Sequence, residues 1–207
     1  LYDKGRLSLT DRVSDYLPYL QDTDKRNITV RELLFHQSGL PSTLQFYQDA
    51  IDEDSYEGTL FKARPDKLHP ARIGRQTWAN PNFRFRPGLT SKVRTAECTL
   101  QVCDSLWLNK SFKKEYLQKI ADAPLRDKRY RYSCVGFILL QQVVEARAGM
   151  PMDEFLAQEF YTPMGLKRTG YLPLRFLSKE EIVPSSVDPF LRKTVLQGFA
   201  HDESAAF

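Results

Sequence analysis

The sequence predicts a mainly helical protein with long irregular loops and few short strands. From Cys134 to Ala148, apolar residues recur every three or four positions, and Gly149 follows as a helix stop. Upstream, Thr29-Val-Arg-Glu32 fits a capping box, in which two side chains bond the free backbone N–H groups of a helix start. Residues 43–94 contain prolines and glycines without periodicity. This pattern indicates a long loop or a covering insertion.

Start and stop signals mark two short helices near the beginning of the chain. Thr10 is a candidate N-cap for a helix from Asp11 to Leu17, with acidic residues in its first turn. The capping box at Thr29 opens a second helix, Val30 to His36, which ends at Ser38-Gly39.

The second half of the chain is predicted to hold the longer helices. Residues 95–108 are ambiguous between helix and strand, although several apolar residues there sit at helical spacing. Ser111 is a candidate N-cap for a helix from Phe112 to Ala121. Pro151 fits the start of a helix from Met152 to Tyr161, and Ser178-Lys-Glu-Glu181 is a second capping box.

Composition excludes several classes of protein. The 207 residues are 42% hydrophobic and 27% charged, with a net charge of +4, which is typical of a globular domain. Basic clusters such as Arg126-Asp-Lys-Arg-Tyr-Arg131 include an acid, so a nucleic-acid partner is not expected. No run is apolar enough to span a membrane. Both ends read as interrupted phrases, so residues 1–207 are expected to be a single partial domain.

Neither a metal site nor a cofactor is expected. The three cysteines are odd in number and lack paired spacing, which argues against a disulfide framework or structural zinc. No histidine has a partner at the spacing of metal ligands. His36 is expected to bond the last carbonyls of its helix, and His69 to be a loop residue. His201-Asp202 could belong to a larger site or to an exposed polar cluster.

A complete set of groups for nucleophilic catalysis is not visible. Ser111-Phe-Lys-Lys114 matches Ser-x-x-Lys by letter, but its flanks are polar and Ser111 is better explained as an N-cap. The chain has no Gly-x-Ser-x-Gly elbow and no phosphate-binding glycine-rich loop.

Tyr132, Ser133 and Cys134 are the remaining candidates, at the first turn of a helix expected to be buried. The spacing alone is not specific, because a tyrosine before a helix is usually a packed aromatic. A phenol has an ordinary pKa of about 10, so it can act as a general base only where nearby cations stabilise the phenolate. A helix N-terminus directly after it favours the same charge.

Four phrases, in order, resemble the serine β-lactamase-like group of class C β-lactamases, D-alanyl-D-alanine carboxypeptidases and esterases. They are residues 1–18, residues 28–41 (Ile-Thr-Val-Arg-Glu-Leu-Leu-Phe-His-Gln-Ser-Gly-Leu-Pro), residues 132–145, which are similar to the Tyr-x-Asn turn and helix, and residues 154–170. Residues 198–205 resemble a phrase of the branch fused to family 3 glycosidases. The resemblance implies the helical lobe of the β-lactamase/transpeptidase-like α/β fold.

The resemblance also implies roles for the candidate residues. The nucleophilic serine of Ser-x-x-Lys and the final Lys-Thr-Gly or His-x-Gly motif would lie outside this chain. Tyr132 takes the position of the tyrosine that helps deprotonate the serine and later protonates the leaving group. Ser133 is the variable middle residue of a substrate-binding turn. Cys134 departs from the family's Asn, whose amide bonds the substrate carbonyl; a thiol is a weaker donor.

The sequence therefore predicts part of a serine hydrolase that acts by acyl transfer on a peptidoglycan peptide, a β-lactam or an ester. By itself this part is expected to be inactive. Two alternatives stay open: a non-catalytic penicillin-recognising module, and a structural lobe of a fused glycosidase. The partner expected for the full-length protein is a small-molecule or peptide substrate. By resemblance, the compartment is the bacterial periplasm or cell envelope.

Overall fold

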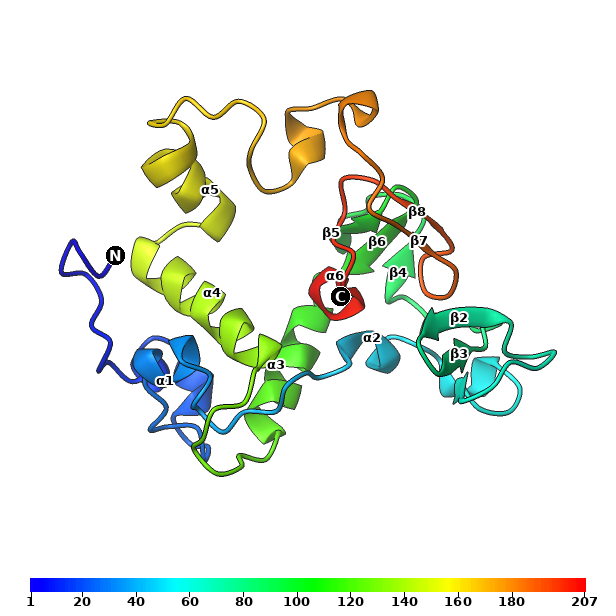
Figure 1. Ribbon diagram of the computed structural model, residues 1–207, viewed down its shortest axis with the longest axis horizontal. Coiled ribbons are helices and arrows are strands. Elements are labelled where there is room, and N and C mark those ends of the chain that lie inside the picture. Colours follow the sequence, from blue (N-terminus) through cyan, green and yellow to red (C-terminus); the bar gives the residue numbers. More distant parts are fainter. The chain divides into compact units, whose positions relative to one another are not determined.

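The computed structural model describes residues 1–207, which form two compact units (Figure 1). The first unit comprises Leu1–Leu44 and Glu115–Pro173, and the second comprises Gln45–Lys114 and Leu174–Phe207. Each unit is therefore built from two stretches that are distant in sequence. The single partial domain expected over residues 1–207 stays a prediction.

The first unit is helical. Its helices are η1 (Val13–Asp15), η2 (Pro18–Leu20), α1 (Val30–Leu34), α4 (Cys134–Ala148), α5 (Met152–Leu156) and the π-helical turn η4 (Ala157–Tyr161), together with most of α3 (Phe112–Asp122). Helix α4 packs beside α1 (Figure 1). Its inward face is fully buried at Val135, Leu139 and Val143. This apolar stripe holds the first unit together.

The second unit contains three small antiparallel sheets with the orders β1-β3-β2, β4-β6-β5 and β7-β8. Its strands are β1 (Phe61–Lys62), β2 (Ala71–Gly74), β3 (Thr77–Ala79), β4 (Thr90–Ser91), β5 (Cys98–Cys103), β6 (Leu106–Asn109), β7 (Ser186–Asp188) and β8 (Thr194–Leu196). The short helices α2 (Phe46–Asp49), η3 (Glu53–Ser55), η6 (Lys179–Glu181) and α6 (Glu203–Ala206) complete the unit, and η5 (Pro173–Arg175) spans its boundary.

The prediction of a mainly α protein was wrong. The chain is 31% helical and 15% strand, with three sheets. Residues 95–108 show why strands were missed in the sequence. Their apolar residues lie on β5 and β6, which pair as a hairpin whose register shifts at two places. Such irregularities interrupt the strict alternation by which a strand is recognised in a sequence.

Local helix signals predicted α4 and two capping boxes more accurately than apolar spacing predicted the strands. Helix α4 runs from Cys134 to Ala148 and ends at Gly149 with φ +75°, as predicted. The capping boxes at Thr29 and Ser178 are both present. The helix predicted from Asp11 to Leu17 was wrong, because only the single 3-10 turn η1 forms there and no side chain caps it.

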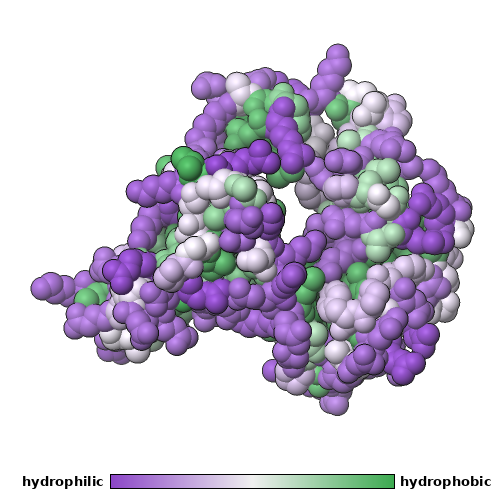
Figure 2. Space-filling view, turned by 180° about the vertical axis from the view of Figure 1, so that it is seen from behind, coloured by the Kyte–Doolittle hydropathy of each residue, from purple (hydrophilic) through white to green (hydrophobic).

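The segment 43–94 contains α2, η3 and strands β1 to β4, joined by irregular chain. No helix of the protein is both long and apolar enough to cross a membrane. The face drawn in Figure 2 is mostly hydrophilic, and its hydrophobic residues gather in small separate groups.

Candidate active site

Two loops of the first unit are joined side by side just before α4 begins. One loop follows α1 and the other runs from Arg126 into the helix. The Arg126 N–H donates to the Gly39 carbonyl at 2.9 Å, and the Cys134 N–H donates to the Ser42 carbonyl at 2.8 Å. Gly39 is buried with φ +82°, and a Cβ there would lie 2.3 Å from the Arg126 carbonyl oxygen. The close approach of the two backbones therefore requires glycine.

Ser133 ties the second loop to the start of α4. It is 1% exposed, and its hydroxyl donates to the Pro41 carbonyl at 2.7 Å and accepts the Gly136 N–H at 3.1 Å. Ser133 is thus the N-cap of α4, which satisfies one of the free N–H groups of the helix. The structure places this predicted substrate-binding residue in the interior, where both hydrogen bonds hold the loop.

Tyr132 lies directly before this cap and is 61% exposed. Its ring centroid is 4.8 Å from that of His36, at an interplanar angle of 47°. More than half of the Tyr132 surface is therefore accessible to solvent, on a loop whose next residue caps the helix. The rings of Tyr130 and Phe137 also lie around His36, at centroid distances of 6.2 and 5.2 Å. Tyr130 is mostly exposed, and Phe137 is half-exposed.

Cys134 is the first residue of α4, and its thiol is free and half-buried. The other two cysteines, Cys98 and Cys103, are buried at the two ends of β5 in the second unit. Burial raises the pKa of the Cys103 thiol. Of the three thiols, only Cys134 stands next to the exposed Tyr132.

His36 differs from its sequence expectation. Its Nδ1 accepts the Ser133 N–H at 3.2 Å, whereas a bond from the ring to the last carbonyls of α1 was expected. Its backbone has φ +54°, a left-handed conformation uncommon for residues other than glycine. The partner is 97 residues away in sequence, so no local pattern could have indicated this contact.

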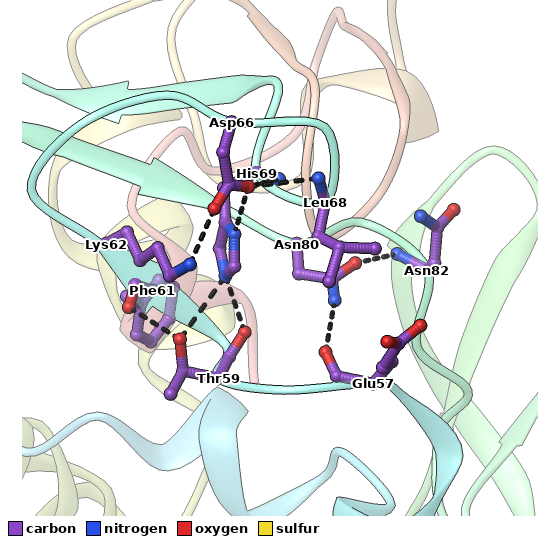
Figure 3. A network of polar contacts seen from close by, with 9 residues as sticks. All are labelled: Glu57, Thr59, Phe61, Lys62, Asp66, Leu68, His69, Asn80 and Asn82. Atoms are coloured by element: carbon purple, nitrogen blue, oxygen red, sulfur yellow. Dashed lines mark hydrogen bonds and ion pairs between the residues drawn. The ribbon is translucent and has the colours of Figure 1, made fainter.

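His69 belongs to a separate polar network in the second unit (Figure 3). It is fully buried; its Nδ1 is 2.7 Å from the Asp66 carboxylate and its Nε2 is 2.7 Å from the Thr59 carbonyl. Both ring nitrogens therefore lie within hydrogen-bond distance of an oxygen. Hydrogen bonds from Lys62 and from His69 hold the pKa of Asp66 well below its usual range. The network stabilises the loop around residues 59–69. Because both ring nitrogens have partners there, His69 is not a candidate for catalysis.

The remaining sequence candidates do not assemble into a site. Ser111 and Lys114, the one Ser-x-x-Lys match, are both exposed at the start of α3. His201 is exposed, and its carbonyl accepts a hydrogen bond from Arg192 at 2.9 Å. The Asp202 side chain caps α6. Each of these residues has a structural environment or lies at the surface, so Tyr132 and its neighbours remain the candidate site.

Comparison with known proteins decides the family. The Beta-lactamase family profile matches residues 1–176. This chain belongs to the beta-lactamase family. Among curated proteins, this chain is 29% identical over its whole length to an N-acetylmuramyl-L-alanine amidase of Bacillus subtilis (strain 168). It is 22% identical, again over its whole length, to a "Putative D-alanyl-D-alanine carboxypeptidase" of Escherichia coli (strain K12).

This chain spans 40% of the length of each of these two relatives. Among solved structures, the octameric penicillin-binding protein homologue from Pyrococcus abyssi is 16% identical, with a TM-score of 0.48 over 99% of this chain and 36% of that one. At that score the likeness adds nothing to the family assignment. The resemblance to the β-lactamase-like group is confirmed by the family match.

Proposed function

We propose that this chain supplies the tyrosine of a β-lactamase-like serine hydrolase that acts by acyl transfer on an amide or ester bond. The observation that carries the proposal is the position of Tyr132. Tyr132 is 61% exposed at the start of α4, while the next residue is 1% exposed and caps that helix. An exposed reactive group on a rigidly held backbone is the arrangement that acid–base catalysis requires.

In the proposed reaction, the deprotonated Tyr132 phenol takes the proton of a serine hydroxyl supplied by a Ser-x-x-Lys helix. The serine oxygen then forms a bond to the carbonyl carbon of the substrate. When the tetrahedral adduct collapses, the bond to the leaving amine or alcohol breaks, and the phenol returns its proton to that group. Water later hydrolyses the acyl-serine ester. In this cycle, the positive end of the α4 helix dipole stabilises the negative charge of the deprotonated Tyr132.

The substrate we propose is an amide of a cell-wall peptide. Support comes from the relatives, whose names describe an N-acetylmuramyl-L-alanine amidase and a carboxypeptidase for D-alanyl-D-alanine. Such a role would place the full-length protein in the bacterial periplasm or cell envelope. β-Lactams are expected to be poorer substrates, because Cys134 lacks the amide with which the family's Asn bonds the substrate carbonyl.

The test compares the 207-residue chain with its full-length parent, using a fluorescent penicillin and a fluorophosphonate probe. The chain alone is expected to stay unlabelled, because its one Ser-x-x-Lys pair, Ser111 and Lys114, is exposed at the surface. The parent should be labelled, and Tyr132→Phe should lower the rate of labelling about 100-fold or more, the usual contribution of a general base. Covalent labelling of a serine in the chain alone would refute the proposed division of the site.

Cys134 favours a second candidate, a penicillin-recognising module that has lost its chemistry. This alternative predicts that the parent binds the penicillin reversibly and that Tyr132→Phe leaves its affinity unchanged. Restoring the family's residue with Cys134→Asn discriminates further, because only a catalytic parent should then acylate faster. The third idea, a structural lobe of a fused glycosidase, predicts no pocket at Tyr132 and would be supported by a tyrosine buried far from any cleft; Tyr132 is 61% exposed.

A further inference from the structure

Tyr132 is held from both sides by one residue. The carbonyl of His36 accepts the N–H of Arg131 at 2.9 Å, and its Nδ1 accepts the N–H of Ser133 at 3.2 Å. The same ring lies against the Tyr132 ring, with centroids 4.8 Å apart. We infer that His36 is a positioning residue for Tyr132, holding the backbone on either side of the phenol and facing its ring. The inference deepens the proposed function and rests on it.

The bond to Ser133 defines the protonation of the His36 ring. Because Nδ1 accepts a hydrogen bond, it carries no proton, and the neutral ring has its proton on Nε2. This tautomer is a consequence of the geometry that can be observed directly. A ring protonated on Nδ1 would place two donors face to face and release the Ser133 N–H.

The backbone of His36 brings its ring to this place. With φ +54° at the end of α1, the chain turns back so that the carbonyl and the ring both point to the loop before α4. The left-handed conformation is unfavourable for a residue with a Cβ. Asn tolerates it better than most residues. Strain of this kind persists where the surrounding contacts determine it, and here the two hydrogen bonds to the Tyr132 loop do so.

Two substitutions separate the acceptor from the ring. His36→Asn keeps an acceptor oxygen close to the place of Nδ1, tolerates the left-handed backbone and removes the ring. His36→Phe keeps an aromatic ring and removes the acceptor. The N–H of Arg131 donates to the backbone carbonyl of residue 36, which every variant retains, so its amide is an internal control.

The experiment measures amide hydrogen exchange and histidine ¹⁵N signals in the 207-residue chain by NMR. His36→Phe is expected to speed exchange at Ser133 about five- to tenfold, as the loss of one hydrogen bond implies, while exchange at Arg131 changes less than twofold. His36→Asn should stay near the wild-type rate at both amides. In the wild-type chain, the His36 ring should show a proton on Nε2 and none on Nδ1.

Three results would overturn the inference: unchanged exchange at Ser133 in His36→Phe, equal acceleration in both variants, or a proton on Nδ1 in the wild-type chain. The catalytic consequence is measured in the full-length parent, where His36→Phe should lower kcat with little change in KM and His36→Asn should recover most of it. If Tyr132→Phe leaves kcat unchanged, the proposed function fails, whereas the exchange result still decides whether His36 positions the loop.

Discussion

Replacing Gly39 by alanine tests whether the two joined loops hold the candidate site. Gly39 has φ +82°, and a Cβ there would lie 2.3 Å from the Arg126 carbonyl oxygen. An ordinary contact begins near 3.4 Å, so the Arg126 backbone would have to retreat by about 1 Å. That retreat pulls on the bond from the Arg126 N–H to the Gly39 carbonyl, which measures 2.9 Å.

The cost can be worked out in two parts. A left-handed alanine costs about 1–2 kcal/mol relative to glycine. Loss of one backbone hydrogen bond adds about 0.5–1.5 kcal/mol. Gly39→Ala should therefore lower the free energy of unfolding by roughly 1.5–3.5 kcal/mol. Gly149→Ala is the matched control, because Gly149 has φ +75° but nothing within 4 Å of its added Cβ. It should show only the backbone part.

The assay is urea unfolding followed by far-UV circular dichroism, since the first unit contains the longest helix, α4. Both tryptophans, Trp78 and Trp107, lie in the second unit, so their fluorescence reports separately on that unit and should not shift. Equal losses for Gly39→Ala and Gly149→Ala would refute the argument, because they would show that the close approach to Arg126 costs nothing. Amide exchange at Arg126 would identify the bond that is lost.

Three further predictions concern groups outside the loops. Burial tends to raise the pKa of Asp188, but hydrogen bonds from Arg192 and three backbone N–H groups outweigh it, so the pKa is lowered overall. The resulting stabilisation is full above the unfolded value of about 3.9 and is lost as pH falls through the folded value. Fluorescence-monitored urea unfolding should thus be flatter with pH in Asp188→Asn than in the wild type, and parallel curves would contradict this. A thiol reagent should label half-buried Cys134 before the two buried cysteines of β5, and Cys134→Ser should remove the fast phase; three equal rates would argue against the packing described. Lys25→Met should lower stability by about 1.5–3 kcal/mol, because the buried ammonium donates to the Ala121 carbonyl at 2.8 Å near the end of α3 and to the Asp24 carboxylate at 2.6 Å; an unchanged urea midpoint would show that these two bonds are dispensable.

The helical parts were predictable because their signals are local. The capping box at Thr29, the apolar stripe of α4 and its stop at Gly149 each depend on residues within one helix. The sheets were not predictable in the same way. Strands of two to six residues with shifted registers carry too little alternation to be distinguished from loop or helix, and their pairing is made between distant segments.

In the candidate site, too, local features were predictable and long-range contacts were not. The sequence by itself indicated the family and the place of Tyr132, Ser133 and Cys134 at the start of a helix, since these follow from the order of residues. Only the tertiary structure decided that the Ser133 hydroxyl is buried against the Pro41 carbonyl and that His36 accepts the Ser133 N–H. Those contacts cross 92 to 97 residues of sequence and depend on a left-handed backbone at His36. Histidine tolerates this conformation better than most residues do but does not prefer it, so the surrounding packing selects it.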